Sequence, residues 1–275
     1  MKHMGLSGVR ANRWRNLNRS GFMLSLTAAL AILFAGSFLT AGSSPLPSPP
    51  AEEISATTET VHFDSGGFNI DAFVAKPAGA GKHPAVLVIH DSMGLNDSIR
   101  EIAKQFAAAG FVALAPDFTS RRGGTRTPDQ MAQAVAQLSP NLTVQDARSA
   151  LDYLQKDSAV DLAKISTVGF GWGGWRSFML AASTPDLFRA VIYSGTTPSQ
   201  SFDAVHAPIL AHYAQYDFRT TGNALVTEKA MTEAGKKFSY FVYPQVYRSF
   251  YLPGMQYNAE AAKLAWTRTL DFLRK

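Results

Sequence analysis

The residues that could carry chemistry lie in a glycine-rich turn in the second half of the chain. Residues 164–169 predict a buried strand, residues 170–174 form a tight turn with three glycines, and a helix is expected from about Trp175. This is the context of the nucleophile elbow, in which the middle residue of G-x-Nuc-x-G attacks a carbonyl carbon. Here the middle residue is Gly171, which has no reactive atom. The turn therefore predicts a scaffold for covalent ester chemistry without its nucleophile.

The partners of such an elbow follow later strands: an acid comes first, and a His after the next strand. Asp217 follows the predicted strand 208–213 and fits the acid position. Arg248 follows the predicted strand 238–243, where a His would act as the base. Because a guanidinium stays protonated, it cannot accept a proton in its place. We expect Arg248 instead to form a charge-assisted, even bidentate, pair with Asp217.

A polar loop follows the predicted strand 84–90 and begins with Asp91 and Ser92. The backbone N–H groups of Ser92 and Trp172 are the expected oxyanion donors. The strand ends also predict a cleft whose aromatic and charged walls suit a small organic acid. Its expected lining residues are Met93, Trp172, Arg219, Tyr247 and Phe250. The loop at residues 121–125 is expected to be exposed, or to form part of the rim of this cleft.

Strands and helices alternate along most of the chain. The strands are predicted at 58–63, 68–75, 84–90, 111–116, 164–169, 189–194, 208–213 and 238–243, and the helices at 98–109, 128–138, 143–155, 175–182, 223–234 and 258–274. The first two strands form a hairpin, and the later apolar runs are typical of strands covered on both faces. The pattern predicts an α/β fold: one domain, a mainly parallel sheet and helices on both faces.

Six stretches together resemble the dienelactone hydrolase (carboxymethylenebutenolidase) family, which has the α/β-hydrolase fold. They are residues 88–96, 99–103, 110–117, 169–174, 212–217 and 260–266. They are spread over nearly all of residues 58–275, and their combination is specific although no single stretch is.

The resemblance implies a Cys, Asp and His triad that opens enol lactones and simple esters, assisted by an acidic residue after the first parallel strand. Position by position, Asp217 is the acid and Asp91 stands for the assisting acid, which is usually Glu. Gly171 replaces the Cys, and Arg248 replaces the His. Two of the three triad members are absent, so we expect a catalytically impaired homologue that keeps a cleft for a small ester, lactone or organic acid.

Two alternatives remain open. An active hydrolase could use a relocated site, with Ser92 or Ser177 as nucleophile and His90 or His212 as base, although both histidines are expected to be packed core residues. A protein of another class could bind NAD(P), because Gly169, Gly171 and Gly174 also match G-x-G-x-x-G. Against this, the motif comes late in the domain, and the next predicted strand does not end in an acidic residue.

Composition adds limits on partners and on location. The chain has 275 residues and a net charge of +5. All the excess charge comes from five basic residues in the first 19, so a nucleic-acid surface is not supported. Those residues precede an uncharged apolar run at 21–41, which predicts a cleaved signal peptide or a membrane anchor within residues 1–42. A Pro/Ser-rich linker at 43–56 would follow, and the domain at 57–275 would be periplasmic or secreted.

No cofactor is expected, and no metal site either. The chain contains no Cys, which excludes thiolate ligands, and its histidines and acidic residues show no metal-binding spacing.

Overall fold

The computed structural model describes residues 56–123, 127–198 and 202–275. The predicted signal or anchor at 1–42, and all of the predicted linker except Ala56, lie outside the described residues. Within the described part, no helix is both long enough and apolar enough to cross a bilayer.

The centre of the domain is an 8-stranded sheet with the order β1-β2-β4-β3-β5-β6-β7-β8. The strands are β1 (Thr57–Ser65), β2 (Phe68–Lys76), β3 (His83–Ile89), β4 (Val112–Pro116), β5 (Val160–Phe170), β6 (Arg189–Tyr193), β7 (Ile209–Ala214) and β8 (Phe238–Tyr243). β1 pairs antiparallel with β2, and β2 pairs antiparallel with β4. All the remaining pairs are parallel, which confirms the predicted hairpin and the mainly parallel sheet.

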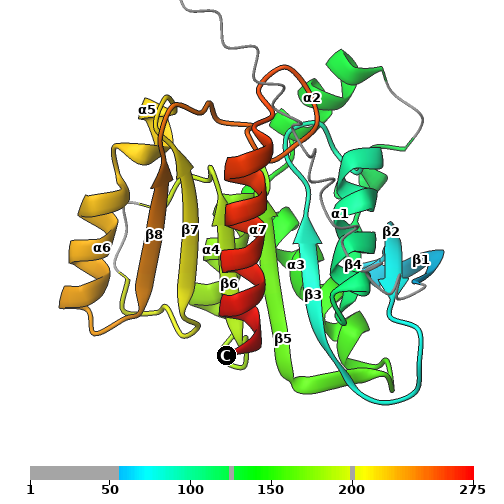
Figure 1. Cartoon of the computed structure of the whole chain (residues 1–275). Coiled ribbons are helices and arrows are strands. Elements are labelled where there is room, and N and C mark those ends of the chain that lie inside the picture. The colour runs from blue at the N-terminus through cyan, green and yellow to red at the C-terminus, as the bar shows by residue number, and fades with distance from the viewer. Residues whose placement is uncertain (1–55, 124–126, 199–201) are drawn as a thin grey trace, which may run out of the picture. The chain divides into compact units, whose positions relative to one another are not determined.

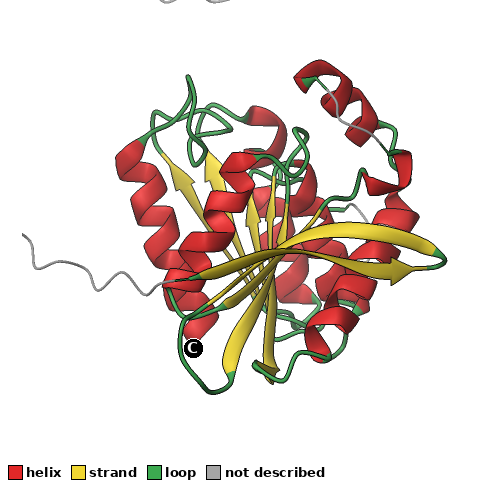
Figure 2. Cartoon of the chain, turned by 90° about the vertical axis from the view of Figure 1, so that its right-hand side faces the viewer, coloured by secondary structure: helices red, strands yellow, loops and turns green. Residues whose placement is uncertain are grey.

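Helices cover both faces of this twisted sheet (Figures 1 and 2). The helices are α1 (Asp97–Ala108), α2 (Pro128–Ala136), α3 (Pro140–Gln155), α4 (Trp172–Ser183), α5 (Phe218–Thr221), α6 (Ala224–Glu233) and α7 (Ala259–Arg274), with a 3-10 turn η1 at Ser120–Arg122. α1 and α7 contribute to one hydrophobic cluster, and α3, α4 and α6 contribute to the other. The sheet therefore has an apolar core on each side, as the continuous apolar strands predict.

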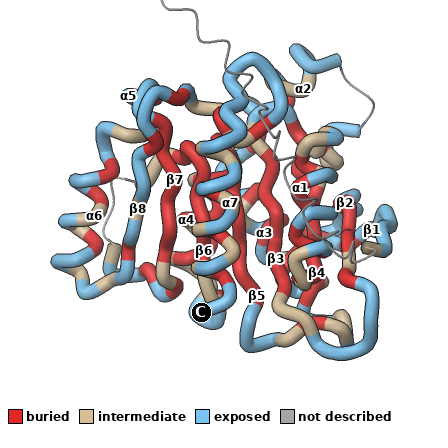
Figure 3. The backbone as a smooth tube through the Cα atoms, viewed as in Figure 1, coloured by how far each residue is buried: buried red, intermediate tan, exposed pale blue. Residues whose placement is uncertain are grey.

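Strand β3 shows how the two cores share one run of apolar residues. Leu87 and Ile89 pack into the core with α3 and α4, and Val86 and Val88 pack into the core with α1 and α7. Successive side chains of a strand point to opposite faces, so an uninterrupted apolar sequence is what a doubly covered strand needs. The inner strands are buried along most of their length (Figure 3).

The structure differs from the predicted elements mainly at their ends. α4 begins at Trp172, three residues before the expected start, because the turn after β5 needs only Gly171. α3 begins at Pro140, where the missing N–H of proline costs no hydrogen bond in the first helical turn. The short α5 and η1 were not expected, and one or two turns leave too little periodicity to recognise.

Candidate active site in the cleft at the strand ends

Gly171 forms the turn between β5 and α4 by itself. Its backbone angles are φ 50° and ψ −105°, and its N–H donates a hydrogen bond to the Tyr193 carbonyl at 2.7 Å. A Cβ added here would lie 3.6 Å from Asp91 Cβ, 3.7 Å from Arg248 Nη2 and 3.8 Å from Tyr251 Oη, which are ordinary contact distances. The position thus keeps the strained backbone typical of an elbow and leaves room for a side chain.

The neighbouring glycines serve close packing of α4 against the sheet. A Cβ on Gly173 would lie 2.4 Å from the Ile89 carbonyl oxygen, and one on Gly169 would lie 2.2 Å from the Gly173 carbonyl oxygen. A Cβ on Gly174 would lie 2.8 Å from the Cα of Gly195. Helix–sheet packing therefore accounts for these three glycines without a dinucleotide.

Asp217 lies at the end of β7, directly before α5, and only 7% of its surface is exposed. Its Oδ2 accepts a hydrogen bond from the Thr220 hydroxyl at 2.5 Å. Arg248, in the loop after β8, places its Nε 3.8 Å from the same Oδ2. The predicted ion pair is therefore present, but this distance exceeds that of a hydrogen bond, and the bidentate form is not adopted.

The Arg248 loop is held by its backbone. The Arg248 carbonyl accepts a hydrogen bond from the Ser194 hydroxyl at 2.8 Å, and Ser194 itself follows β6 with a positive φ of 49°. The contacts of Arg248 with Ser194 and Asp217 thus join the loops after β6, β7 and β8.

The loop after β3 brings Asp91 to the elbow. Asp91 Oδ1 accepts a hydrogen bond from the Met93 N–H at 2.8 Å. The preceding His90 is fully buried, and its Nε2 accepts a hydrogen bond from the Phe118 N–H at 3.4 Å. His90 Nδ1 therefore carries the proton and donates it to the Asp91 carbonyl at 2.7 Å. Burial lowers the pKa of His90, whose ring also stacks on Trp172 at 5.3 Å.

His212 and Ser177 have equally structural roles. His212 is buried, with Nδ1 2.9 Å from the Tyr243 hydroxyl and Nε2 3.0 Å from the Thr269 hydroxyl. Ser177 is buried too, and its hydroxyl bonds the Thr167 hydroxyl at 2.7 Å and the Val191 carbonyl at 3.1 Å. The contacts of His90 are likewise with other buried groups of the protein. Of the four residues considered for a relocated nucleophile or base, Ser92 alone borders the cleft.

A cavity of about 460 Å³ opens beside the elbow. Of the predicted site residues, the structure brings Asp91, Ser92, Gly171, Trp172, Arg219 and Arg248 to its wall. Its other lining residues are Ala132, Val135, Ala136, Trp175, Arg176, Thr196, Ser249 and Tyr251. Ser92 and Trp172, expected to supply the oxyanion donors, therefore lie on one cavity.

Sequence reasoning missed two groups at this cavity. Tyr251, from the Arg248 loop, has its hydroxyl 3.8 Å from the point that a Gly171 Cβ would occupy, and burial and the nearby Asp91 raise its pKa. Arg176 comes from the second turn of α4 and is 7% exposed. A basic residue in an otherwise apolar elbow helix was the available signal for Arg176.

Three of the residues predicted for the cleft wall lie elsewhere. Phe250 is fully buried and packs between Tyr243 and Tyr251, because its ring completes the core beneath the loop. Met93 and Tyr247 are exposed and lie outside the cavity wall, and Tyr247 packs on another exposed ring, that of Tyr216.

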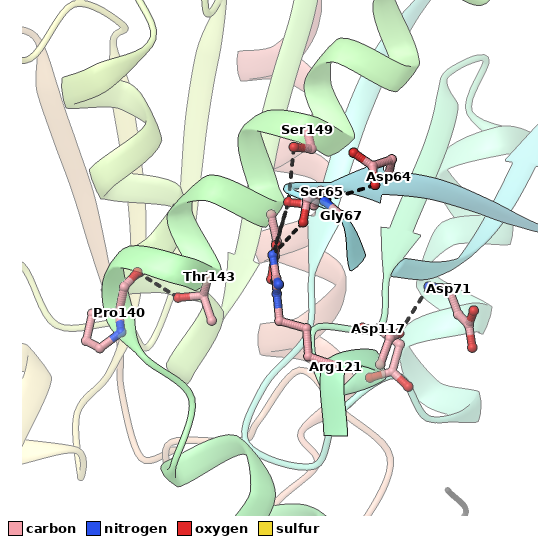
Figure 4. A network of polar contacts seen from close by, with 11 residues as sticks. Asp64, Ser65, Gly67, Asp71, Asp117, Arg121, Pro140, Thr143 and Ser149 are labelled. Atoms are coloured by element: carbon pink, nitrogen blue, oxygen red, sulfur yellow. Dashed lines mark hydrogen bonds and ion pairs between the residues drawn. The ribbon is translucent and has the colours of Figure 1, made fainter. Parts of the chain in front are cut away.

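The expected exposure of this loop is found at Arg122 and Gly123 but is wrong for Arg121. Its side chain is 11% exposed and forms an ion pair with the buried Asp146. Arg121 Nη2 also donates to the Ser65 carbonyl at 2.8 Å, and the Ser149 hydroxyl bonds the Ser65 hydroxyl at 3.1 Å. This network joins β1, η1 and α3 (Figure 4) and does not border the cavity.

The described part of the chain contains no group of three metal-ligating side chains that could hold an ion. The cavity offers instead three guanidinium groups, one carboxylate and a helix N-terminus.

Comparison with known proteins agrees with this architecture. Two curated relatives, from Methylorubrum extorquens and Saccharolobus solfataricus, carry the name "Putative carboxymethylenebutenolidase", and each is 28% identical to this chain. The matches cover 75% and 78% of this chain, and 77% and 97% of the relatives. A solved structure from Klebsiella pneumoniae, titled "Putative Dienelactone Hydrolase", superposes with a TM-score of 0.73. It is 23% identical and covers 80% of this chain and 99% of its own, which shows a shared fold.

The family model of the dienelactone hydrolases matches residues 70–275. This range includes the elbow, Asp91, Asp217 and Arg248. The chain belongs to the dienelactone hydrolase family, in the α/β-hydrolase fold.

Proposed function

We propose that this protein is a dienelactone hydrolase homologue that has lost covalent hydrolysis and keeps its cleft to bind a small molecule. The observation that carries the proposal is the pair of substitutions at one point in space. Gly171 offers no nucleophile, and the Arg248 guanidinium lies 3.7 Å from where its Cβ would be.

The loss of rate should be large. Removing a complete Ser-His-Asp triad from another hydrolase costs about a million-fold in turnover, and the remaining rate comes from the oxyanion hole and binding. Arg248 cannot act as a general base, since a guanidinium has no lone pair to accept a proton. His90 and His212 are buried and hydrogen-bonded, so neither can act as the base from its observed position.

The alternative is a hydrolase that uses Ser92, which borders the cavity beside Asp91. Steady-state hydrolysis of an activated aryl ester and of a dienelactone by the native chain separates the two functions. The Ser92→Ala and Asp217→Asn variants are the matched controls. We expect the native chain and both variants to give the same rate, close to the background rate in buffer. Saturable turnover by the native chain that is lost in Ser92→Ala would overturn the proposal.

A further inference from the structure

Arg176 is a buried cation without a carboxylate partner among the described residues. Its Nη1 donates to the Trp172 carbonyl at 3.1 Å, its Nε donates to the Thr143 hydroxyl at 3.3 Å, and its guanidinium lies 3.5 Å from the centre of the Trp172 ring. Burial lowers the pKa of Arg176 to about 9, so the group is still charged at neutral pH. A desolvated charge that lacks a counter-ion is costly, and an anion in the adjoining cavity would reduce that cost.

Positive charge predominates around the cavity. Arg176, Arg219 and Arg248 lie on its wall with one acid, Asp91. Arg219 forms no ion pair with a described carboxylate, and Asp91 already accepts the Met93 N–H. Even when Asp217, the partner of Arg248, is included, the arginines outnumber the acids. An anionic ligand is therefore favoured over a neutral or cationic one.

The elbow adds donors at the same place. Gly171 precedes the 12-residue helix α4, whose first two backbone N–H groups, those of Trp172 and Gly173, lack intrahelical acceptors. The helix dipole favours negative charge at that end. Because Gly171 has no side chain, the space that a nucleophile would fill is open between α4 and Arg248 Nη2.

We infer that the cleft binds the carboxylate or another oxyanion group of a small ligand at the start of α4, with Arg176, Arg219 and Arg248 as its cationic partners. The inference deepens the proposed function and rests on it, since a cleft freed from catalysis is available for binding. Gly171 at the nucleophile position and Arg248 at the base position then both favour the binding of an anion where the hydrolysis would otherwise take place.

Isothermal titration of the full chain tests this with three probes: sodium benzoate, inorganic phosphate, and benzamide as the neutral match of benzoate. We expect saturable binding of an anion and none of benzamide. Binding of benzoate alone would assign a carboxylate ligand, and binding of phosphate alone would assign a phosphorylated one. If benzamide binds as tightly as benzoate, or if neither anion binds, the inference is wrong.

The variants Arg176→Met and Arg219→Met test the two arginines without ion pairs. Each should weaken anion binding about tenfold or more, the usual effect of losing a hydrogen bond between charged groups. Arg219 is exposed, so its variant keeps the test decisive if Arg176→Met fails to fold. Arg189→Met is the matched control, because Arg189 also lacks an ion pair among the described residues and packs on Phe188 and Phe272, at the opposite end of β6.

The two proposals fail in different ways. Ester turnover by the native chain would overturn the loss of hydrolysis and would leave a measured anion affinity standing. An inactive native chain that binds neither anion would overturn the inference alone. Affinity that is unchanged in both Arg176→Met and Arg219→Met would likewise contradict it.

Discussion

Arg248 reaches from Asp217 to the elbow with one side chain. Its Nε lies 3.8 Å from Asp217 Oδ2, and its Nη2 lies 3.7 Å from the position of a Cβ on Gly171. A catalytic base must span the same two points, because it receives a proton from the nucleophile and is oriented by the acid. In the proposed function, the guanidinium takes the place of the base and supplies a fixed positive charge instead of a proton acceptor.

The glycines of the elbow should differ in their tolerance of a methyl group. In Gly171→Ala the new Cβ has room, and the positive φ alone should reduce the free energy of unfolding by about 1–3 kcal/mol. In Gly173→Ala the Cβ would meet backbone oxygen at 2.4 Å, so the loss should exceed about 3 kcal/mol. Urea denaturation measures both values. Equal losses would show that α4 does not pack against β3 as closely as the 2.4 Å distance implies.

Two ion pairs of this domain should contribute very differently to stability. Asp146 is 1% exposed and pairs with Arg121, so Asp146→Ala should cost about 3–5 kcal/mol by leaving a buried guanidinium uncompensated. The Arg248 side chain is 38% exposed and its pair is long, so Arg248→Ala should cost about 1 kcal/mol or less.

Urea midpoints of the two variants beside the native chain give this comparison. A cost for Arg248→Ala as large as that for Asp146→Ala would mean that the Asp217 pair is structural. In that case Arg248 would serve the stability of the fold, and its presence at the base position could not be attributed to the chemistry of the cleft.

Buried His212 should make the domain sensitive to acid. Burial, and next the nearby Arg268, lower the pKa of His212 from 6.5 to about 3, while the unfolded chain keeps the ordinary value. As the pH falls below 6.5, the unfolded state therefore binds the proton first, and stability decreases by up to about 1.4 kcal/mol per pH unit. The loss ends near the folded pKa, and this contribution to stability is fully present above 6.5.

Unfolding free energies at pH 7.5 and 5.0 test the role of His212. Between these values the native chain should lose about 2 kcal/mol more than His212→Gln loses. If His212→Gln shows the same pH dependence as the native chain, another group causes the acid sensitivity.

The sheet and the main elbow positions could be predicted because their signals are local. Apolar runs such as residues 84–90 have the length and composition of doubly covered strands, and the glycines after β5 mark a turn that few other residues can adopt. The acid and base positions follow from chain order, since the carboxyl ends of parallel strands meet at one edge of the sheet. Asp217 and Arg248 are accordingly found together.

The incorrect predictions concern side chains whose burial depends on the direction in which they point or on a partner far away in the sequence. Phe250 and Tyr251 are adjacent aromatic residues in one loop, and only the fold determines that the first fills the core and the second faces the cleft. The Arg121 side chain is only 11% exposed because Asp146, 25 residues later, turns toward it from α3. The sequence contains no pattern that pairs these two residues.

We propose that the native scaffold lacks only its nucleophile and its base. The double variant Gly171→Cys, Arg248→His tests this proposal, through kcat/KM for an activated aryl ester measured beside the native chain and both single variants. We predict that the double variant turns over and is blocked by a thiol-alkylating reagent, while the native chain remains at background. Turnover by the native chain equal to that of the double variant would refute the proposal, because the reaction would then not depend on the elbow.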